Sequence, residues 1–489
     1  MIMLTPLAVQ LCRSLKHIVD TTIDLQYIIQ LHLTGMADNP AHPLSTSGKL
    51  AVLQRYHAQW YSLPAHLEHA ATFNVIGAYY CQSEHGRDTL GIGPSVDFDY
   101  HFAQLPSRIR GIPFKSWILR LPEHTSFFTM DPQQDVLTIL KETPGSSDLY
   151  LHILELSTGK EHPLASCPLI PLLDGRARDW FKLRISGPYV CVTFMADDLP
   201  VIFNWRSGHR RCIGLRTVSF TWIGPTHFLG HIGSAGGVNP VGPYLFLVDL
   251  SHPETEGRQW EFDLPEILAH KSEAHLEFDL TCEPATSQGR GSPDSLFDIA
   301  EEDSVVVLSA RENSFSIFFL ASRLLEIARD TAHMAPGTIV VPWKVWGPGH
   351  THTNETFGCG HDYYPYGMRS AHMENNQLYV LDFNRQRAQR RLQARNNEHE
   401  EDGSTQIRAY SRTFWRRLID EDEEATDEQI DELSLDLVES NGLGEPLFVQ
   451  TVLPYDIPEG SDICGFSEDA IHTRRTLEDR SQSYDVYTL

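Results

Sequence analysis

Residues 188–210 read "PYVCVTFMADDLPVIFNWRSGHR", and this stretch decides the fold that we predict for the chain. It contains two runs rich in apolar and β-branched residues, 188–194 and 199–204, with a short polar segment between them. Runs of this kind bounded by Pro, Asp and Gly are typical of antiparallel strands joined by turns. A polar turn containing Gly208 follows the second run. The stretch therefore predicts one strand–turn–strand unit.

Similar units recur along the chain, which makes a repeat the main feature of its body. They are "DVLTILKE" with "LYLHILELSTGK" (135–160), "HFLGHIG" with "PYLFLVDLSHPE" (227–254), "SVVVLSA" with "SFSIFFLAS" (304–322) and "NQLYVLDFNRQ" (376–386). Glu155, Asn204 and Asp249 occupy equivalent positions in three of the units. Their spacings of 49 and 45 residues are close to the roughly 40–50 residues of a propeller blade.

A series of apolar hairpins must protect the edges of its sheets, and a ring of sheets leaves only short, protected edges. We therefore predict a mainly β protein that has a small α-helical N-terminal module and a propeller-like, WD40-like β domain of six or seven blades. The C-terminal stretch 463–489 is predicted to close the ring as a further hairpin. An irregular pair of β-sandwiches is the alternative fold.

The predicted domain organisation has three parts. Residues 1–67 form the helical module, 68–114 form a connecting segment and possible first blade, and 115–489 form the propeller-like domain. Residues 385–445 begin basic and turn strongly acidic, so we expect them to be a solvated surface insertion.

The N-terminal residues follow a helical period instead of the period of a strand. Apolar side chains recur on one face of two short predicted helices, at Leu11, Leu15, Ile18 and Val19 and then at Leu25, Ile28, Ile29 and Leu33. Asp20 to Thr22 offers N-caps for the second helix, and Gly35 offers a left-handed stop. A third helix is predicted to start at Ser45 or Ser47.

The stretch 11–36, "LCRSLKHIVDTTIDLQYIIQLHLTGM", resembles the C-terminal half of an F-box. In that motif a "VCR-x-L" helix is followed by a short break and an "LQY-x-I" helix. With its continuation through "GMADNP" and "LAVLQRYHAQW", the N-terminal part is similar to fungal F-box proteins that have long β-rich C-terminal regions. An F-box docks on the Skp-family linker protein of a cullin–RING ubiquitin ligase, and the remainder of the chain binds the substrate.

The resemblance implies a docking surface and also a departure from the family pattern. The residues that match the "VCR-x-L" helix are implied to bind the linker: Leu11, Cys12, Leu15, Ile18 and Val19. Packing against the second helix is the alternative role for the same residues. The opening "MIMLTPLAVQ" lacks the "LP-x-E" helix with which an F-box starts, so we expect a truncated version of the motif.

The resemblance implies a non-catalytic adaptor, the substrate-recognition subunit of a Skp–cullin–F-box ubiquitin ligase that holds a protein target through its β domain. A propeller interaction scaffold without a ligase role and a metal-dependent propeller hydrolase remain alternatives. The hydrolase would use His350, His352, Cys359 and His361, but their spacing matches no strong zinc signature. We therefore predict an inter-blade loop without metal, and no cofactor. Trp343, Trp346 and Tyr366 nearby are predicted to pack between blades.

Composition restricts the partners and the compartment. Among 489 residues, 39 are Lys or Arg and 65 are Asp or Glu, and a net charge of −26 disfavours binding to nucleic acid or anionic lipid. The eight cysteines include no CxxC pair, which is typical of reduced thiols in a cytoplasmic or nuclear protein. The sequence contains no G-x-S-x-G elbow, P-loop or dinucleotide-binding glycine pattern. We find no catalytic set.

Overall fold

The structure is a computed structural model. It describes the residues 13–61, 68–75, 83–86, 89–92, 99–104, 106–107, 112–121, 127–142, 149–172, 181–194, 199–215, 217, 219–232, 243–251, 258–265, 278–282, 296–299, 304–310, 315–334, 337–347, 350–355, 363–374, 377–384, 386–387, 405–409, 447–453, 461–466, 470–477 and 482–488.

Three four-stranded antiparallel sheets form the first blades of the body, and the strands of each sheet lie in chain order. Blade 1 contains β3 (Ser83–Gly86), β4 (Thr89–Ile92), β5 (Asp99–Gln104) and β6 (Lys115–Arg120). Blade 2 contains β7 (Phe127–Asp131), β8 (Val136–Glu142), β9 (Leu149–Glu155) and β10 (Leu169–Leu172). Blade 3 contains β11 (Phe181–Ser186), β12 (Tyr189–Phe194), β13 (Val201–Asn204) and β14 (Arg210–Cys212).

The next three sheets follow the same plan with additions. Blade 4 contains β15 (Ser219–Trp222), β16 (His227–Ile232), β17 (Tyr244–Asp249), β18 (Gln259–Asp263) and, from later in the chain, β23 (Thr338–Val341). Blade 5 contains β19 (Phe278–Thr281), β21 (Val305–Ala310), β22 (Phe315–Leu320) and β24 (Thr351–Glu355). Blade 6 contains β25 (Tyr364–Tyr366), β26 (Arg369–Glu374), β27 (Gln377–Asp382), β29 (Leu447–Leu453) and β28 (Thr405–Ala409).

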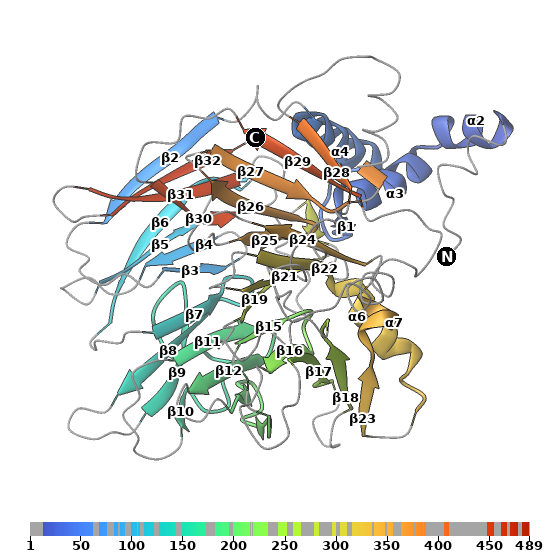
Figure 1. The fold of residues 1–489 in the computed structure, drawn as a ribbon. Coiled ribbons are helices and arrows are strands. Elements are labelled where there is room, and N and C mark those ends of the chain that lie inside the picture. Colours follow the sequence, from blue (N-terminus) through green and yellow to red (C-terminus); the bar gives the residue numbers. More distant parts are fainter. Residues whose placement is uncertain are drawn as a thin grey trace.

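Blade 7 joins the two ends of the β domain. Three of its strands are C-terminal, β30 (Ser461–Phe466), β31 (Ala470–Thr476) and β32 (Gln482–Thr488). Its fourth strand is β2 (Glu68–Val75), which pairs antiparallel with β32, so that blue and red strands share one sheet in Figure 1. A closed ring satisfies the backbone groups that open sheet edges would leave unpaired. The predicted C-terminal hairpin is therefore the closing element, and it recruits a partner from residues 68–114.

The seven sheets form a β-propeller (Figure 1). The first strands of neighbouring blades contact one another, as β7 does with β3 and β11, and β15 with β19. The predicted mainly β, propeller-like fold is confirmed, and the structure gives seven blades. The repeat units of the sequence are the second and third strands of their blades, for example β8 with β9 and β12 with β13. These strands carry the apolar side chains that form the cores between sheets.

A polar cluster joins the first strands of three blades. The Lys182 ammonium lies 2.6 Å from an Oδ1 of Asp279, and the Ser219 hydroxyl donates to the same oxygen at 2.7 Å. Lys182 also donates to the Ser219 Oγ at 2.8 Å. These residues belong to β11, β15 and β19, so this inter-blade cluster connects blades 3, 4 and 5.

The connection from β22 to β24 leaves blade 5 and crosses to blade 4. It contains α6 (Ala321–Asp330), β23 and α7 (Trp343–Trp346), and we call residues 321–346 the strap. Strand β23 pairs in parallel with β18, and α6 and β23 lie beside β17 and β18 in Figure 1. The fully buried Trp346 packs edge-on against Phe262 of blade 4 and Phe319 of blade 5. This position confirms the predicted inter-blade role of Trp346.

The described residues 13–61 contain three helices, as predicted. Helix α2 spans Arg13–Thr21, α3 spans Ile23–Thr34 and α4 spans Thr46–Tyr61. Gly35 ends α3 with a left-handed φ of 69°, and the Ser45 hydroxyl accepts from the Gly48 N–H at the start of α4. Between them β1 (Met36–Asp38) pairs with β20 (Phe297–Ile299). A short pairing of strands thus ties the helical module to the body.

Residues 385–445 were predicted to be a solvated surface insertion, and this prediction does not hold over the whole segment. Most of it lies outside the described residues, but Thr405–Ala409 forms β28 and pairs with β29 in blade 6. Arg387 was expected in the solvated part, yet it is 5% exposed and ion-paired. The prediction is wrong at these two places because charge composition does not report the partners that the fold brings near.

Candidate functional site: the N-terminal helices and their contact with the propeller

Helices α3 and α4 pack against blades 6 and 7. Their buried side chains Tyr27, Leu50, Leu53 and Tyr56 share one hydrophobic cluster with residues of the two blades. The blade residues in this cluster are Tyr366, Ala371, Leu378, Val380, Ile463, Ile471 and Tyr487. Burying an apolar side chain of this size stabilises a fold by about 1.5–3 kcal/mol. The helical module is therefore part of the packed structure and has a fixed orientation on the propeller.

The C-terminal end of α3 is capped by a residue from blade 6. The last carbonyl groups of a helix have no partner within the helix. The Asn384 amide donates to the carbonyl oxygens of Leu33 at 3.1 Å and His32 at 3.4 Å. Asn384 lies 351 residues from Leu33 in the sequence. The cap thus fixes the end of a helix through a contact that no local pattern contains.

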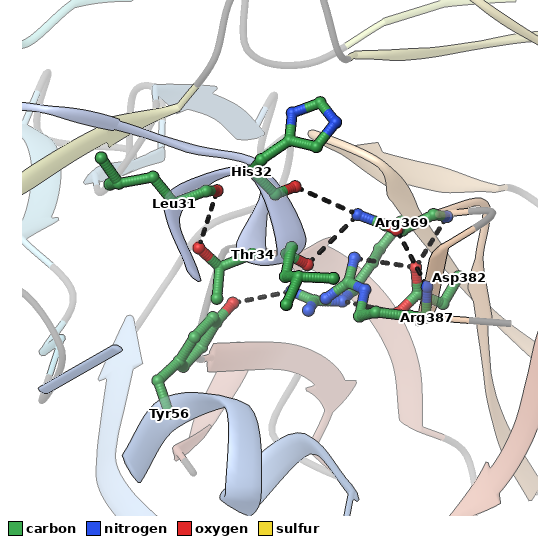
Figure 2. A network of polar contacts seen from close by, with 9 residues as sticks. Leu31, His32, Thr34, Tyr56, Arg369, Asp382 and Arg387 are labelled. Atoms are coloured by element: carbon green, nitrogen blue, oxygen red, sulfur yellow. Dashed lines mark hydrogen bonds and ion pairs between the residues drawn. The ribbon is translucent and has the colours of Figure 1, made fainter. Parts of the chain in front are cut away.

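A buried ionic network lies beside this cap (Figure 2). Arg387 donates to Asp382 at 2.8 Å, and the Nε of Arg369 lies 3.5 Å from the other carboxylate oxygen of Asp382. Arg369 also donates to the hydroxyl of Tyr56 on α4 at 2.6 Å. The side chains of both arginines are 6% exposed. We call Tyr56, Arg369, Asp382, Asn384 and Arg387 the helix anchor.

A second polar group fixes the turn between α3 and α4. The Lys49 ammonium donates to Asp38 and to the Asn39 carbonyl, both at 2.7 Å, and Tyr27 donates to Asp38 at 2.6 Å. Burial by itself would raise the pKa of Asp38, but the hydrogen bonds from Lys49 and Tyr27 outweigh it and lower this pKa. Burial and the Asp38 carboxylate raise the pKa of Tyr27. At neutral pH the Asp38 carboxylate is therefore ionised and the Tyr27 phenol keeps its proton, so this phenol can donate its hydrogen bond to the carboxylate.

Helix α2 is placed differently from α3 and α4. It contacts α3 and extends away from the blades, as Figure 1 shows. Of the five residues implied to dock a linker protein, Leu11 and Cys12 lie outside the described residues. Leu15 is half-buried, Val19 is 9% exposed and Ile18 is 50% exposed. The described residues of this helix face therefore differ in exposure, and the large apolar side chain of Ile18 is open to solvent.

Helix α3 also has exposed apolar side chains. Ile23 is 48% exposed and Ile28 is 50% exposed, as Ile18 is on α2. Exposed apolar side chains are ordinary when they are scattered, and they mark a binding surface when they form one contiguous patch. The helical period of apolar residues predicted that Ile18 and Ile28 lie on helix faces, and it did not include Ile23.

Part of the histidine-rich loop, which contains His350, His352, Cys359 and His361, lies on β24 of blade 5. Another part lies outside the described residues. His352 lies on β24, is 6% exposed, and its ring packs near Phe318 and Phe383. Cys359 and His361 lie outside the described residues. Within the described part of the chain, no three His, Cys, Asp or Glu side chains come together as a candidate metal site. The surroundings of His352 are those of a core residue.

Sequence reasoning missed the helix anchor. Its propeller residues lie within 369–387, where the sequence predicted the strand unit 376–386 and placed Arg387 in the solvated insertion, but assigned no role to Arg369. A weak signal was present, because Asp382 ends a strand, Asn384 follows it, and Asx side chains at such positions accept from nearby N–H groups. The partners of these residues in distant parts of the chain could not be predicted from the sequence.

Comparison with known proteins gives likeness of fold alone. No family model and no curated protein matches the chain. Among solved structures it is similar to Hsv2 of Kluyveromyces lactis, with 10% identity and a TM-score of 0.39, over 82% of this chain and 90% of that chain. It is also similar to the N-terminal domain of Nup159, with 10% identity and a TM-score of 0.38, over 87% and 96%. All these TM-scores lie below 0.5, so the fold rests on the sheets described above.

No helix among the described residues has the length and apolar character that crossing a lipid bilayer requires.

Proposed function

We propose that this protein is a non-catalytic adaptor, in which the propeller binds one protein and the N-terminal helices bind another. The more specific proposal is the substrate-recognition subunit of a Skp–cullin–F-box ubiquitin ligase, with the Skp-family linker on α2 and α3. The observation that carries the proposal is the exposure of Ile18 on α2 and of Ile23 and Ile28 on α3, the helix whose C-terminal end the helix anchor holds on the propeller.

The physical reason is geometric. An adaptor brings a target close to a second protein, and its benefit is a raised effective concentration, which falls when the connection is loose. The helix anchor and the shared hydrophobic cluster remove that looseness for α3 and α4.

The test is binding of the purified Skp-family linker protein to the full chain, measured by biolayer interferometry. The variant Ile18→Asp places a charge in the exposed apolar surface without touching a buried contact. We expect its affinity to fall at least about tenfold, because a desolvated carboxylate costs more than about 1.4 kcal/mol.

The matched control is Leu164→Asp, which makes the same kind of change at a side chain that is 60% exposed on blade 2. Its affinity for the linker should stay unchanged. Equal binding by both variants would contradict the assignment of α2 as the docking helix. Absence of linker binding by the unmodified chain would contradict the ligase role and leave the propeller scaffold as the proposed function.

A further inference from the structure

A cavity of about 330 Å³ lies where the strap meets blade 4. One wall comes from the β15–β16 turn and from β17 and β18, and the other comes from α6 and the residues that follow it. Its volume is at the lower end of the range of small-ligand sites, roughly 300–1,000 Å³. The cavity exists because the strap crosses from blade 5 to blade 4.

The charged lining of the cavity is predominantly cationic. Among the residues that the structure describes around it, Arg258 and Arg329 face the cavity together with one carboxylate, that of Asp249. Asp249 already accepts from the Ser251 N–H at 2.8 Å and from the Ser251 hydroxyl at 2.9 Å. Burial lowers the pKa of His227, and Arg329 lowers it further although Asp249 raises it, so this imidazole is neutral at pH 7. A chain with a net charge of −26 thus has an excess of positive charge here.

The remaining lining is apolar and held in place. Ile223, Trp260, Leu325 and Ala328 line the cavity. The Trp260 indole N–H donates to the Thr331 hydroxyl at 2.8 Å, which fixes the ring against the strap. An apolar wall next to guanidinium groups fits a ligand that has an aliphatic part and an anionic part.

We propose that this cavity binds a carboxylate that carries an aliphatic group. A carboxylate fits the planar fork of an arginine through two parallel N–H···O bonds. Arg258 has donors for this, since its described hydrogen bond is one of 3.4 Å from Nη2 to the Met334 carbonyl. The aliphatic group packs on Trp260 and Leu325. The C-terminal residue of a peptide and a small aliphatic acid share this chemistry.

The site uses no residue of α2 or of the helix anchor, so its test is independent of the proposed adaptor function. The probe is N-acetyl-leucine, with N-acetyl-leucinamide as the neutral ligand of the same shape, both titrated into the full chain by ligand-observed NMR. We expect N-acetyl-leucine to bind at least about tenfold more tightly than the amide. N-acetyl-alanyl-leucine separates the two sources: tighter binding than the single amino acid indicates a peptide terminus, and equal binding indicates a small acid.

Two variants locate the binding. Arg258→Gln removes the guanidinium and should weaken N-acetyl-leucine about tenfold or more, and Ala332→Glu should do the same by adding a competing carboxylate. Arg206→Gln, at an exposed arginine on the β13–β14 turn of blade 3, should change nothing. Equal affinity for acid and amide, no effect of Arg258→Gln, no binding at about 10 mM, or binding of inorganic phosphate alone would each overturn the proposal.

Discussion

The inter-blade cluster and the helix anchor are both built on an aspartate, but they join different parts of the molecule and differ in their exposure to solvent. In the inter-blade cluster the side chains of Lys182 and Asp279 are 28% and 31% exposed. In the helix anchor Asp382 is 17% exposed and its two arginines 6%. The first cluster connects neighbouring blades of a repeat, and the second attaches a helical module to the ring.

The comparison indicates in which of the two clusters the loss of one charged side chain should destabilise the fold more. Water screens a partly exposed ion pair, so its contribution to stability is small. Removing one member of a buried pair leaves the other uncompensated, which is strongly destabilising. Asp382 contacts two arginines in less exposed surroundings than those of Asp279, so we expect the loss of its charge to cost more free energy of folding.

The largest effect is therefore expected for Asp382→Asn. The change removes the carboxylate charge that Arg369 and Arg387 both contact in the buried helix anchor, and the free energy of unfolding should fall by about 3 kcal/mol. Urea unfolding followed by circular dichroism measures this value. Limited proteolysis should also release the N-terminal helices before the propeller is cleaved.

Asp99→Asn is the control for that prediction. Asp99 makes two hydrogen bonds to Arg120, at 2.7 and 3.0 Å, but the Arg120 side chain is 74% exposed. Its loss should cost less than about 1 kcal/mol. Similar losses in the two variants would remove the distinction between buried and exposed pairs in this protein.

A smaller effect is expected for Asp279→Asn, about 1–2 kcal/mol at pH 7 because the cluster is partly exposed. Burial would raise the pKa of Asp279, but attraction to Lys182 and hydrogen bonds from Lys182 and Ser219 outweigh it and lower this pKa. A depressed carboxylate pKa stabilises the fold above the unfolded value of 3.8 and loses that contribution as pH falls below it.

The measurement for this prediction is stability against pH from neutral to acidic conditions. The unmodified chain should lose the Asp279 contribution below about pH 4, and the variant should lack that part of the acid transition. If the variant and the unmodified chain have the same stability at neutral pH, the cluster does not hold the blades together.

The smallest effect concerns His231, which lies opposite Ser219 in blade 4 and is fully buried. Its ring packs edge-on against Phe278 of blade 5, and among the described residues neither ring nitrogen has a hydrogen-bond partner. Burial lowers the pKa of His231 from 6.5 to about 3. Stability is complete above pH 6.5 and decreases as pH falls from there toward 3, because the unfolded chain binds the proton first.

His231→Leu should remove this loss and gain about 1 kcal/mol over the unmodified chain near pH 5.5, relative to the difference between them at pH 7.5. Thermal unfolding at the two pH values measures it, with the exposed His209→Leu as the control. An unchanged pH dependence in His231→Leu would show that the inter-blade contact tolerates a charged imidazole.

The candidate site was predictable from the sequence only in its local parts. The helices, the stop at Gly35 and the start at Ser45 depend on residues within a few positions of one another, so they were read correctly. The exposure of Ile18 and the burial of Val19 could not be predicted from the sequence, because adjacent residues of one helix can have different surroundings in the folded chain. The roles of Asp382 and Arg387 were missed because the helix anchor to which they belong joins blade 6 to helices more than 300 residues away in the sequence.

The sequence by itself determined the hairpin repeat, the three helices and the acidic character, since period, turn residues and charge act over short distances along the chain. Only the tertiary structure decided that β2 closes the ring with β32, that the strap forms a cavity on blade 4, and that Arg369 meets Tyr56 across 313 residues of sequence. Contacts of this kind follow from the path of the whole chain, and the residues that make them carry no local mark of their partners.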